Sequence, residues 1–271
     1  MTADPKGDFL SGASGQVWGK RATSRAVVAD AYADARARIT GLPWRLRRAA
    51  REAPRRRILA LAVERVDEPN LLSSIHDELM QSRHDVRFES TPTGQRGKFA
   101  NLNHLLSSHP AQGHDWLLVV DDDVRLPRGF LDAFVFLIER FDLRLAQPAH
   151  RARSHAAWKV TRRRAGSVLR QTAFVEAGPV TAFHSETYEA LLPFPDLRAG
   201  WGLDAHWSAV AGQRGWRLGV VDATPVHHAM RQVAVHYDRT ATIAEAHEFL
   251  ADKPYLRAPE AQRTLAIYRR W

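Results

Sequence analysis

Between residues 58 and 221, short apolar runs alternate with segments of helical period, which is the pattern of βαβ units. The clearest run is 116–120, where five apolar residues in succession predict a strand buried on both faces of a sheet. We expect strands at 58–63, 86–89, 116–120, 144–148, 174–176, 180–183 and 218–221, and helices at 71–82, 98–107, 131–141, 185–192 and 203–214. The predicted fold class is α/β, a single domain with a mostly parallel central sheet flanked by helices.

The two ends of the chain have a different pattern. Residues 24–51 are rich in Ala and Arg and predict an Arg-faced helix followed by a linker, while 243–251 and 259–270 predict two peripheral helices. We therefore divide the chain into a basic helical leader at 1–57, a main domain at 58–238 and a C-terminal helical extension at 239–271.

Positive charge is concentrated in the leader. The chain holds 39 Lys and Arg against 30 Asp and Glu, and residues 1–57 hold 13 of those cations but only 5 of the acids. A basic leader could contact anionic lipid or nucleic acid, or it could be a solvated helical face. Because the main domain is nearly neutral and carries no nucleic-acid-binding motif, we expect no nucleic-acid partner. The oligomeric state stays open.

Several classes of protein are excluded by composition. The chain has no cysteine, which excludes disulfides, zinc fingers and thiol nucleophiles. No apolar run approaches the roughly 20 residues that cross a bilayer, and the N-terminus lacks the apolar region of a signal peptide. We expect a cytoplasmic protein, with peripheral contact to the inner face of the membrane through residues 1–57 as an open alternative.

Three consecutive aspartates, Asp121, Asp122 and Asp123, follow directly after the 116–120 strand. Like charges packed together repel one another unless a cation neutralises them. Carboxylates at a strand end suit Mg²⁺ or Mn²⁺, and in open α/β sheets this edge is where ligands bind. The alternative is an exposed acidic turn or the N-cap of the next helix.

The segment 116–124, W-L-L-V-V-D-D-D-V, resembles the strand and DxD motif of GT-A-fold glycosyltransferases. The resemblance implies a Rossmann-like GT-A fold. It also implies that Asp121 faces the ribose or sugar, with Asp122 beside it, and that Asp123 binds the metal that bridges the nucleotide diphosphate.

Upstream, the segment 96–103 resembles the G-K-x-x-A-L-N segment of family-2-like transferases. The resemblance places Lys98 and Asn101 at the donor nucleotide, where a lysine and helix-start amides can meet phosphate. The alternative is an ordinary helix start with an exposed lysine.

Downstream, Gly200-Trp201-Gly202-Leu203-Asp204 resembles the G-W-G-x-(E/D) block of the same enzymes. The resemblance implies that Trp201 and Gly202 shape the sugar pocket and that Asp204 is the general base for the acceptor hydroxyl. The sequence has one acid where galactosyltransferase-like members have a Glu-Asp pair. The alternatives are a helix N-cap for Asp204 and a core aromatic for Trp201.

The segment 219–228, which ends in two histidines, resembles the late strand after which a histidine completes the metal site. We choose His228 as the ligand, with His227 as the alternative, and a histidine ligand favours Mn²⁺ over Mg²⁺. From 175 to 228 the chain is most similar to an uncharacterised plant and bacterial family thought to be GT-A-like, and the resemblance as a whole covers about residues 58–230.

These resemblances together imply a metal-dependent glycosyltransferase. The donor would be a nucleotide-diphosphate sugar and the acceptor a hydroxyl on a glycan, a lipid-linked molecule or a small molecule, with inversion if Asp204 is the base. Cations such as Lys159 or Arg162 could close over the phosphates as a lid. The rival functions are a metal-dependent phosphoesterase or nuclease, and a non-catalytic protein that binds nucleic acid or membrane through the leader.

Overall fold

The structure, a computed structural model, describes residues 8–10, 19–228, 230 and 238–271. Its centre is a sheet whose main path runs β2-β1-β3-β7-β5-β8-β6-β9, with β4 paired to the far end of β8. The strands are β1 (Arg57–Glu64), β2 (Asp85–Pro92), β3 (Trp116–Asp121), β4 (Val124–Arg125), β5 (Leu143–His150), β6 (Leu169–Thr172), β7 (Val180–His184), β8 (Arg217–His228) and β9 (Thr264–Tyr268).

The direction of the strands confirms the predicted α/β class. β1 is parallel to β2 and β3, and β5 is parallel to β8. β7 lies between these two groups and is antiparallel to β3 and β5, and β6 is antiparallel to β8 and β9. All strands of the main path except β6 and β7 therefore point the same way, and their carboxyl ends share one edge of the sheet.

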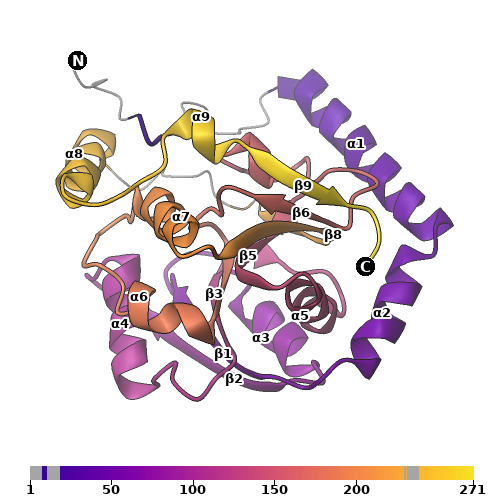
Figure 1. Cartoon of the computed structure of the whole chain (residues 1–271), viewed down its shortest axis with the longest axis horizontal. Helices are drawn as coiled ribbons and strands as arrows, with labels where there is room; N and C mark the ends of the chain where they lie inside the picture. Colours follow the sequence, from indigo (N-terminus) through magenta and orange to yellow (C-terminus); the bar gives the residue numbers. More distant parts are fainter. Residues whose placement is uncertain (1–7, 11–18, 229, 231–237) are drawn as a thin grey trace.

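Helices cover both faces of the sheet (Figure 1). Alternate residues of β3 enter two different cores, as the unbroken apolar run predicts: Leu118 packs with α3 and α5, and Leu117 packs with α4 and α7. The helices of the main domain are α3 (Leu72–Met80), α4 (Lys98–Ser108), α5 (Phe130–Arg140), α6 (Tyr188–Leu191) and α7 (Leu203–Gln213), with short 3₁₀ turns at Lys159–Thr161 and Ser185–Thr187.

The described part of the leader forms two helices where the sequence predicts one helix and a linker. α1 (Gly19–Ile39) and α2 (Leu42–Glu52) follow one another along one side of the molecule (Figure 1). The chain turns between them at Gly41, whose φ of 63° lies in the left-handed region that glycine adopts at no steric cost. Residues 1–7 and 11–18 of the predicted leader lie outside the described residues.

The predicted strand at 174–176 is wrong, because the strand in this region is β6. Arg170 made this stretch look like a basic loop, yet its side chain is only 5% exposed. Its guanidinium forms an ion pair of 2.8 Å with Asp222 of β8, which neutralises the charge inside the sheet. A partner more than 50 residues away thus decides the local structure.

The C-terminal extension also differs from the prediction. α8 (Arg239–Leu250) confirms the first helix, but 259–270 contains only a short helical turn, α9 (Ala258–Ala261), before β9. β9 pairs with β6 and completes the sheet, so β8 is not the last strand along the chain. An unpaired edge on β6 offers backbone hydrogen bonds that outweigh the helical preference of these residues.

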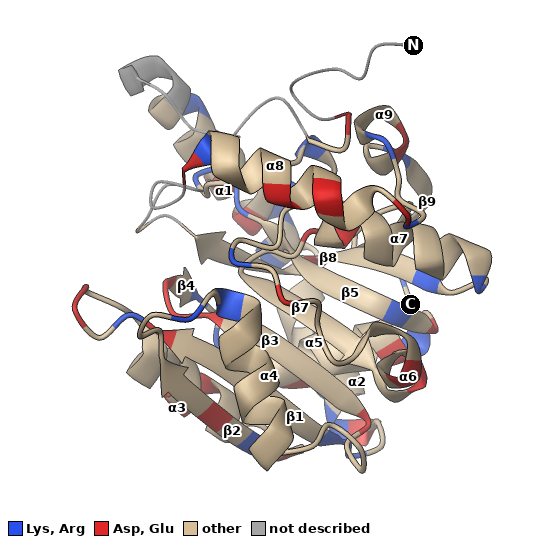
Figure 2. Ribbon diagram, turned by 90° about the vertical axis from the view of Figure 1, so that its left-hand side faces the viewer, with Lys and Arg blue, Asp and Glu red and all other residues tan. Residues whose placement is uncertain are grey.

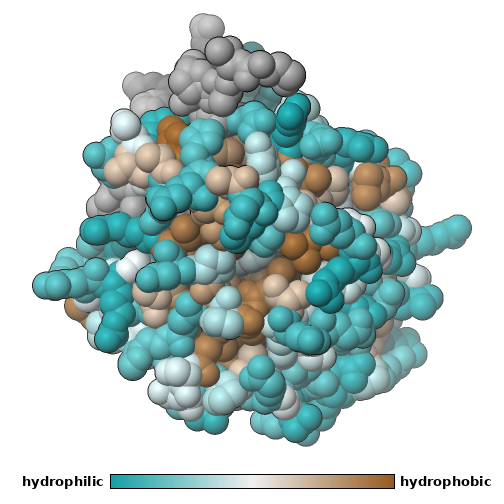
Figure 3. All heavy atoms as spheres, turned by 60° about the vertical axis from the view of Figure 1, so that its left-hand side comes forward, coloured by the Kyte–Doolittle hydropathy of each residue, from teal (hydrophilic) through white to brown (hydrophobic). Residues whose placement is uncertain are grey.

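The surface is polar over most of the face that carries α4, α6 and α8, with a band of apolar residues across its middle (Figure 3). Acidic and basic residues both occur on the ribbon seen from this side (Figure 2). Among the described residues, no helix combines the length and the apolar character that a membrane span requires.

Candidate functional site

The two outer aspartates of the triplet meet His228 because β4 pairs with β8. Asp121 ends β3, Asp123 lies in the turn that follows, and the antiparallel register sets Val124 opposite His228. As a result Asp123 Oδ1 is 3.1 Å from His228 Nε2. Asp121, Asp123 and His228 each offer one ligand atom, and these three atoms lie within 4.8 Å of one another. We refer to these three residues as the carboxylate–histidine group.

The carboxylate–histidine group fits a divalent cation. Asp123 and His228 are buried, and the Nδ1 atom of His228 has no hydrogen-bond partner among the described residues. Burial by itself would lower the pKa of His228, but the hydrogen bond and charge of Asp123, together with Asp121 and Glu176, outweigh burial and raise it. Two carboxylates and one imidazole form a donor set for Mn²⁺ or Mg²⁺, with the imidazole favouring Mn²⁺.

Adjacent histidines on a strand point to opposite faces, and the structure brings His228 rather than His227 to the carboxylates. His227 is paired in register with Arg125. Its pKa is lowered by burial and by the positive charges of Arg153, Arg125 and Arg151. His227 therefore lies among cations on the other side of the strand.

Asp122 does not join the carboxylate–histidine group. Its carboxylate accepts a hydrogen bond of 2.7 Å from the backbone N–H of Arg65, and its carbonyl accepts one of 2.6 Å from the N–H of Leu71. Both contacts fix the segment between β1 and α3 against the end of β3. The middle acid of the triplet thus holds the chain in place.

Lys98, the first residue of α4, lies at the carboxylate–histidine group. Its Nζ is 2.6 Å from Oδ1 of Asp121. Asn101, one turn later, is buried and donates a hydrogen bond of 2.8 Å to the carbonyl of Thr93, so it positions the loop before the helix. Of the two residues predicted for the nucleotide, Lys98 is therefore at the site and Asn101 supports it from behind.

The Gly-Trp-Gly loop brings Asp204 into the first turn of α7. Gly200 has a φ of +71°, and a side chain there would overlap the ring of Phe99 in α4. Gly202 is buried at the start of α7. Trp201 is partly buried, packs in the cluster that contains Leu250 of α8, and has a guanidinium, that of Arg239, 5.7 Å from its ring centroid.

Asp204 is electrostatically unlike the carboxylate–histidine group. Burial and the negative charge of Glu176 raise its pKa to about 7, although backbone N–H groups, including that of Ala205 at 2.9 Å, partly offset the rise. A carboxylate whose pKa lies near neutrality can accept a proton and release it again. Asp204 can therefore exchange a proton near neutral pH.

Glu176 and His150 also lie at the site, and neither was among the residues predicted from sequence. Glu176 interacts electrostatically with Asp204 and with His228, and its Oε2 is 3.3 Å from Nε2 of His150. Burial alone would raise the pKa of Glu176, but the nearby imidazole of His150, the backbone N–H of Ala157 and the charge of His228 together outweigh burial and lower it. His150 ends β5, the parallel neighbour of β8. The sequence signal for it is a histidine two residues beyond a predicted strand, 144–148.

The basic stretch after β5 is tied to other parts of the fold. The carboxylate of Asp34 in α1 pairs with Arg151 and Arg163 at 2.9 and 2.6 Å, and the guanidinium of Arg162 donates to the carbonyl of Ala152. Lys159 is exposed. The lid predicted from these cations stays a prediction.

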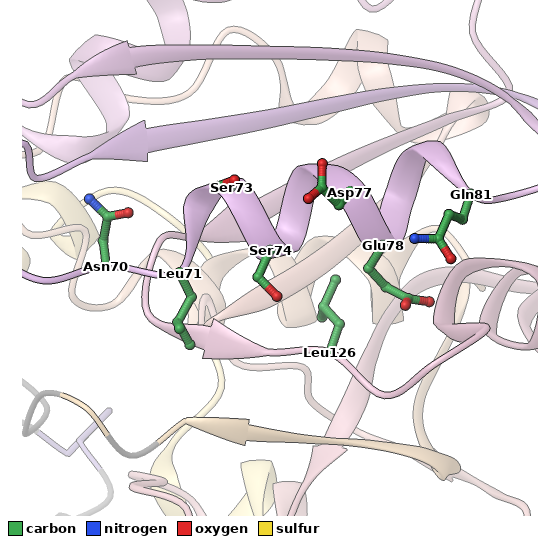
Figure 4. A pocket seen from close by; sticks show the side chains of 8 residues that line it. All are labelled: Asn70, Leu71, Ser73, Ser74, Asp77, Glu78, Gln81 and Leu126. Atoms are coloured by element: carbon green, nitrogen blue, oxygen red, sulfur yellow. The ribbon is translucent and has the colours of Figure 1, made fainter.

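A separate hollow of about 470 Å³ opens beside α3 (Figure 4). The residues that line it are Asn70, Leu71, Ser73, Ser74, Asp77, Glu78, Gln81 and Leu126. Oε1 of Glu78 accepts hydrogen bonds from the backbone N–H groups of Gly129 and Phe130 at the start of α5. None of these lining residues belongs to the carboxylate–histidine group.

The solved structures that are similar to this chain include three with a TM-score of 0.46 each. A197 from STIV is 13% identical and covers 65% of this chain and 87% of its own. GalNAc-T7 with UDP, GalNAc and Mn²⁺ is 11% identical, covering 72% and 48%, and S. aureus TarS 1–349 in complex with UDP-GlcNAc is 10% identical, covering 69% and 61%. The chain thus spans about half of GalNAc-T7 and three fifths of TarS. No family model and no curated protein matches the sequence.

Proposed function

We propose that the protein is a metal-dependent glycosyltransferase that moves a sugar from a nucleotide-diphosphate sugar to an acceptor hydroxyl. One observation carries the proposal: the carboxylate–histidine group and a carboxylate with a pKa near 7 occur at the same end of the domain, linked electrostatically through Glu176. Glycosyl transfer needs both, a cation at the leaving diphosphate and a base at the acceptor.

On the donor side, Asp121, Asp123 and His228 would hold Mn²⁺ or Mg²⁺, and the cation would stabilise charge on the departing diphosphate. Lys98 would exchange part of its contact with Asp121 for a donor phosphate, because an ammonium group binds either anion. Trp201 and Gly202 would line the sugar end of the donor site.

On the acceptor side, Asp204 would take the proton of the attacking hydroxyl. The bond from that oxygen to the anomeric carbon forms as the bond to the diphosphate oxygen breaks, which gives inversion when attack is in line. Glu176 keeps Asp204 basic enough to accept the proton near neutrality. The acceptor class, whether glycan, lipid-linked or small molecule, stays open.

The test is the thermal stability of the purified chain with a panel of nucleoside diphosphates and their sugars, in Mn²⁺, Mg²⁺ or EDTA. A ligand that binds only the folded state raises the melting temperature by mass action. We expect a metal-dependent rise with one nucleotide, lost in Asp123→Ala and kept in Asp122→Asn, whose side chain can still accept the hydrogen bond from Arg65.

The product then separates the rival reactions. Release of free nucleoside diphosphate together with a glycosylated acceptor supports the transferase. Release of inorganic phosphate or a cut phosphodiester, without sugar transfer, would favour the phosphoesterase. Absence of any nucleotide-dependent shift in the presence of metal would overturn the proposal.

A further inference from the structure

The outer side of α1 carries an apolar stripe that the body of the protein does not cover. Val28, Tyr32 and Ile39 are 67%, 59% and 86% exposed, and their spacing places them on one face of the helix. Trp44, which is 60% exposed, follows just after the turn into α2. We refer to the outward sides of α1 and α2 together as the outer face.

The acids of α1 point the other way. Asp30 and Asp34 are the only acidic residues between positions 19 and 51. Asp30 is 4% exposed and accepts a hydrogen bond of 2.8 Å from the N–H of Ala152, while Asp34 pairs with Arg151 and Arg163. Because both carboxylates are used on the inner side, the outer face of α1 carries no negative charge.

Cations outnumber acids in this part of the chain, and the exposed Glu52 lies 3.7 Å from Arg48. Residues 36–57 contain nine arginines and a single acid, Glu52. On α2, Leu46 and Ala50 face the body, and the exposed arginines Arg47, Arg48 and Arg51 surround Trp44. The guanidinium of Arg48 lies 5.9 Å from the ring centroid of Trp44. Within the described residues, neither Arg47 nor Arg51 has an acidic partner.

Exposed apolar and cationic side chains on one face fit an anionic lipid surface better than a nucleic acid. The phosphates of a duplex would neutralise the arginines but leave Val28 and Ile39 in water. At a bilayer the arginines meet lipid phosphates, tryptophan and tyrosine favour the interface, and the aliphatic side chains enter its apolar boundary. We propose that the outer face of α1 and α2 docks the protein on membranes that contain anionic phospholipid.

The test is co-sedimentation of the full chain with vesicles of phosphatidylcholine alone and of equal parts phosphatidylcholine and phosphatidylglycerol. We expect binding to the anionic vesicles only, weakened by added salt. Replacing Arg47, Arg48 and Arg51 by Gln removes three cations from the outer face and should weaken binding on the order of 100-fold. Ile39→Ser should weaken it further while leaving the salt dependence unchanged.

The matched control removes the same charge elsewhere. Arg128, Arg214 and Arg263 are exposed and lie outside α1 and α2, so changing these three to Gln should leave vesicle binding within about twofold of the wild type. Equal loss in both triple variants would show that binding follows net charge alone and would overturn the proposal.

Two further measurements test whether each variant is still folded and still binds Mn²⁺. Each variant is melted to confirm folding, and its Mn²⁺ binding is measured, because the docking proposal is independent of the proposed reaction. Tighter binding to duplex DNA than to anionic vesicles, lost in the Arg47, Arg48 and Arg51 variant, would instead assign the outer face to nucleic acid. Binding to phosphatidylcholine alone, insensitive to salt, would also contradict the proposal.

Discussion

The carboxylates of the candidate site differ in the charge that lies next to them. Asp121 and Asp123 have a lysine and a histidine at 2.6 and 3.1 Å. Asp204 has Glu176 as its charged neighbour, and burial together with that negative charge raises its pKa to about 7. The same type of side chain is thus suited to hold a cation in one place and to accept a proton in the other.

The largest effect should come from removing one of the carboxylates that would hold the cation. Asp123→Asn removes a ligand charge, and since even outer-shell partners of a metal are worth 10- to 100-fold in affinity, we expect Mn²⁺ binding and transfer to fall by at least about 100-fold. Calorimetric titration with Mn²⁺ measures the affinity. Asp122→Asn, the neighbouring isosteric change, should bind Mn²⁺ like the wild type, and equal loss in both would contradict the separate roles of these acids.

Removing the carboxylate that would accept the proton should reduce the rate of transfer and leave cation binding unchanged. In Asp204→Asn the amide cannot accept the hydroxyl proton, and we expect kcat to fall about 100- to 10,000-fold with Mn²⁺ affinity unchanged. Initial rates with saturating donor, together with the Mn²⁺ titration, make the measurement. If Mn²⁺ binding fell as far as in Asp123→Asn, the two groups of acids would act as one.

The same substitution should stabilise the fold. A carboxyl group with a folded pKa near 7 and a usual value of 3.8 holds a proton in the folded state that the unfolded chain releases, so stability falls as the pH rises between these values. Above pH 7 the penalty reaches at most about 4 kcal/mol. Without metal, Asp204→Asn should therefore unfold at higher denaturant than the wild type at mildly alkaline pH, and the difference should vanish below the usual pKa of Asp. A constant difference across pH would be inconsistent with the raised pKa.

The smallest effect should come from Glu176→Gln. This change removes the negative charge near Asp204 and so separates its effect on the pKa of Asp204 from that of burial. The pKa of Asp204 should fall, and the acid limb of the pH dependence of kcat should move to lower pH. His150→Gln provides the control, since it alters the partner of Glu176 and keeps the carboxylate. An acid limb that does not move would mean that burial alone sets the pKa of Asp204.

Most of the fold could be predicted because its strands and helices have strong local patterns. The run 116–120 and the period of α3, α4 and α5 depend on neighbours close in sequence. β6 and β9 could not be predicted, since the first depends on the buried pair between Arg170 and Asp222 and the second on a free sheet edge. Both causes lie far away along the chain.

The site residues that could be predicted are those in a motif that lies at the end of a strand. Asp123 and His228 come together, and Lys98 contacts Asp121, which joins them. Asp122 and Asn101 could not be sorted from their neighbours, because hydrogen bonds to the backbone of Arg65 and Thr93 decide where their side chains point. The sequence shows which polar residues are close together along the chain. Packing in the folded protein decides which of their side chains face the site.

The pairing of β4 with β8 brings Asp123 next to His228, which lies 105 residues further along the chain. A cation held by both would act as a reversible cross-link in a chain that has no cysteine. In the chain-entropy model, a covalent link that closes a loop of about 100 residues stabilises a fold by about 4 to 5 kcal/mol. A chelator should therefore loosen this edge of the sheet and lower the melting temperature, in addition to slowing the proposed transfer.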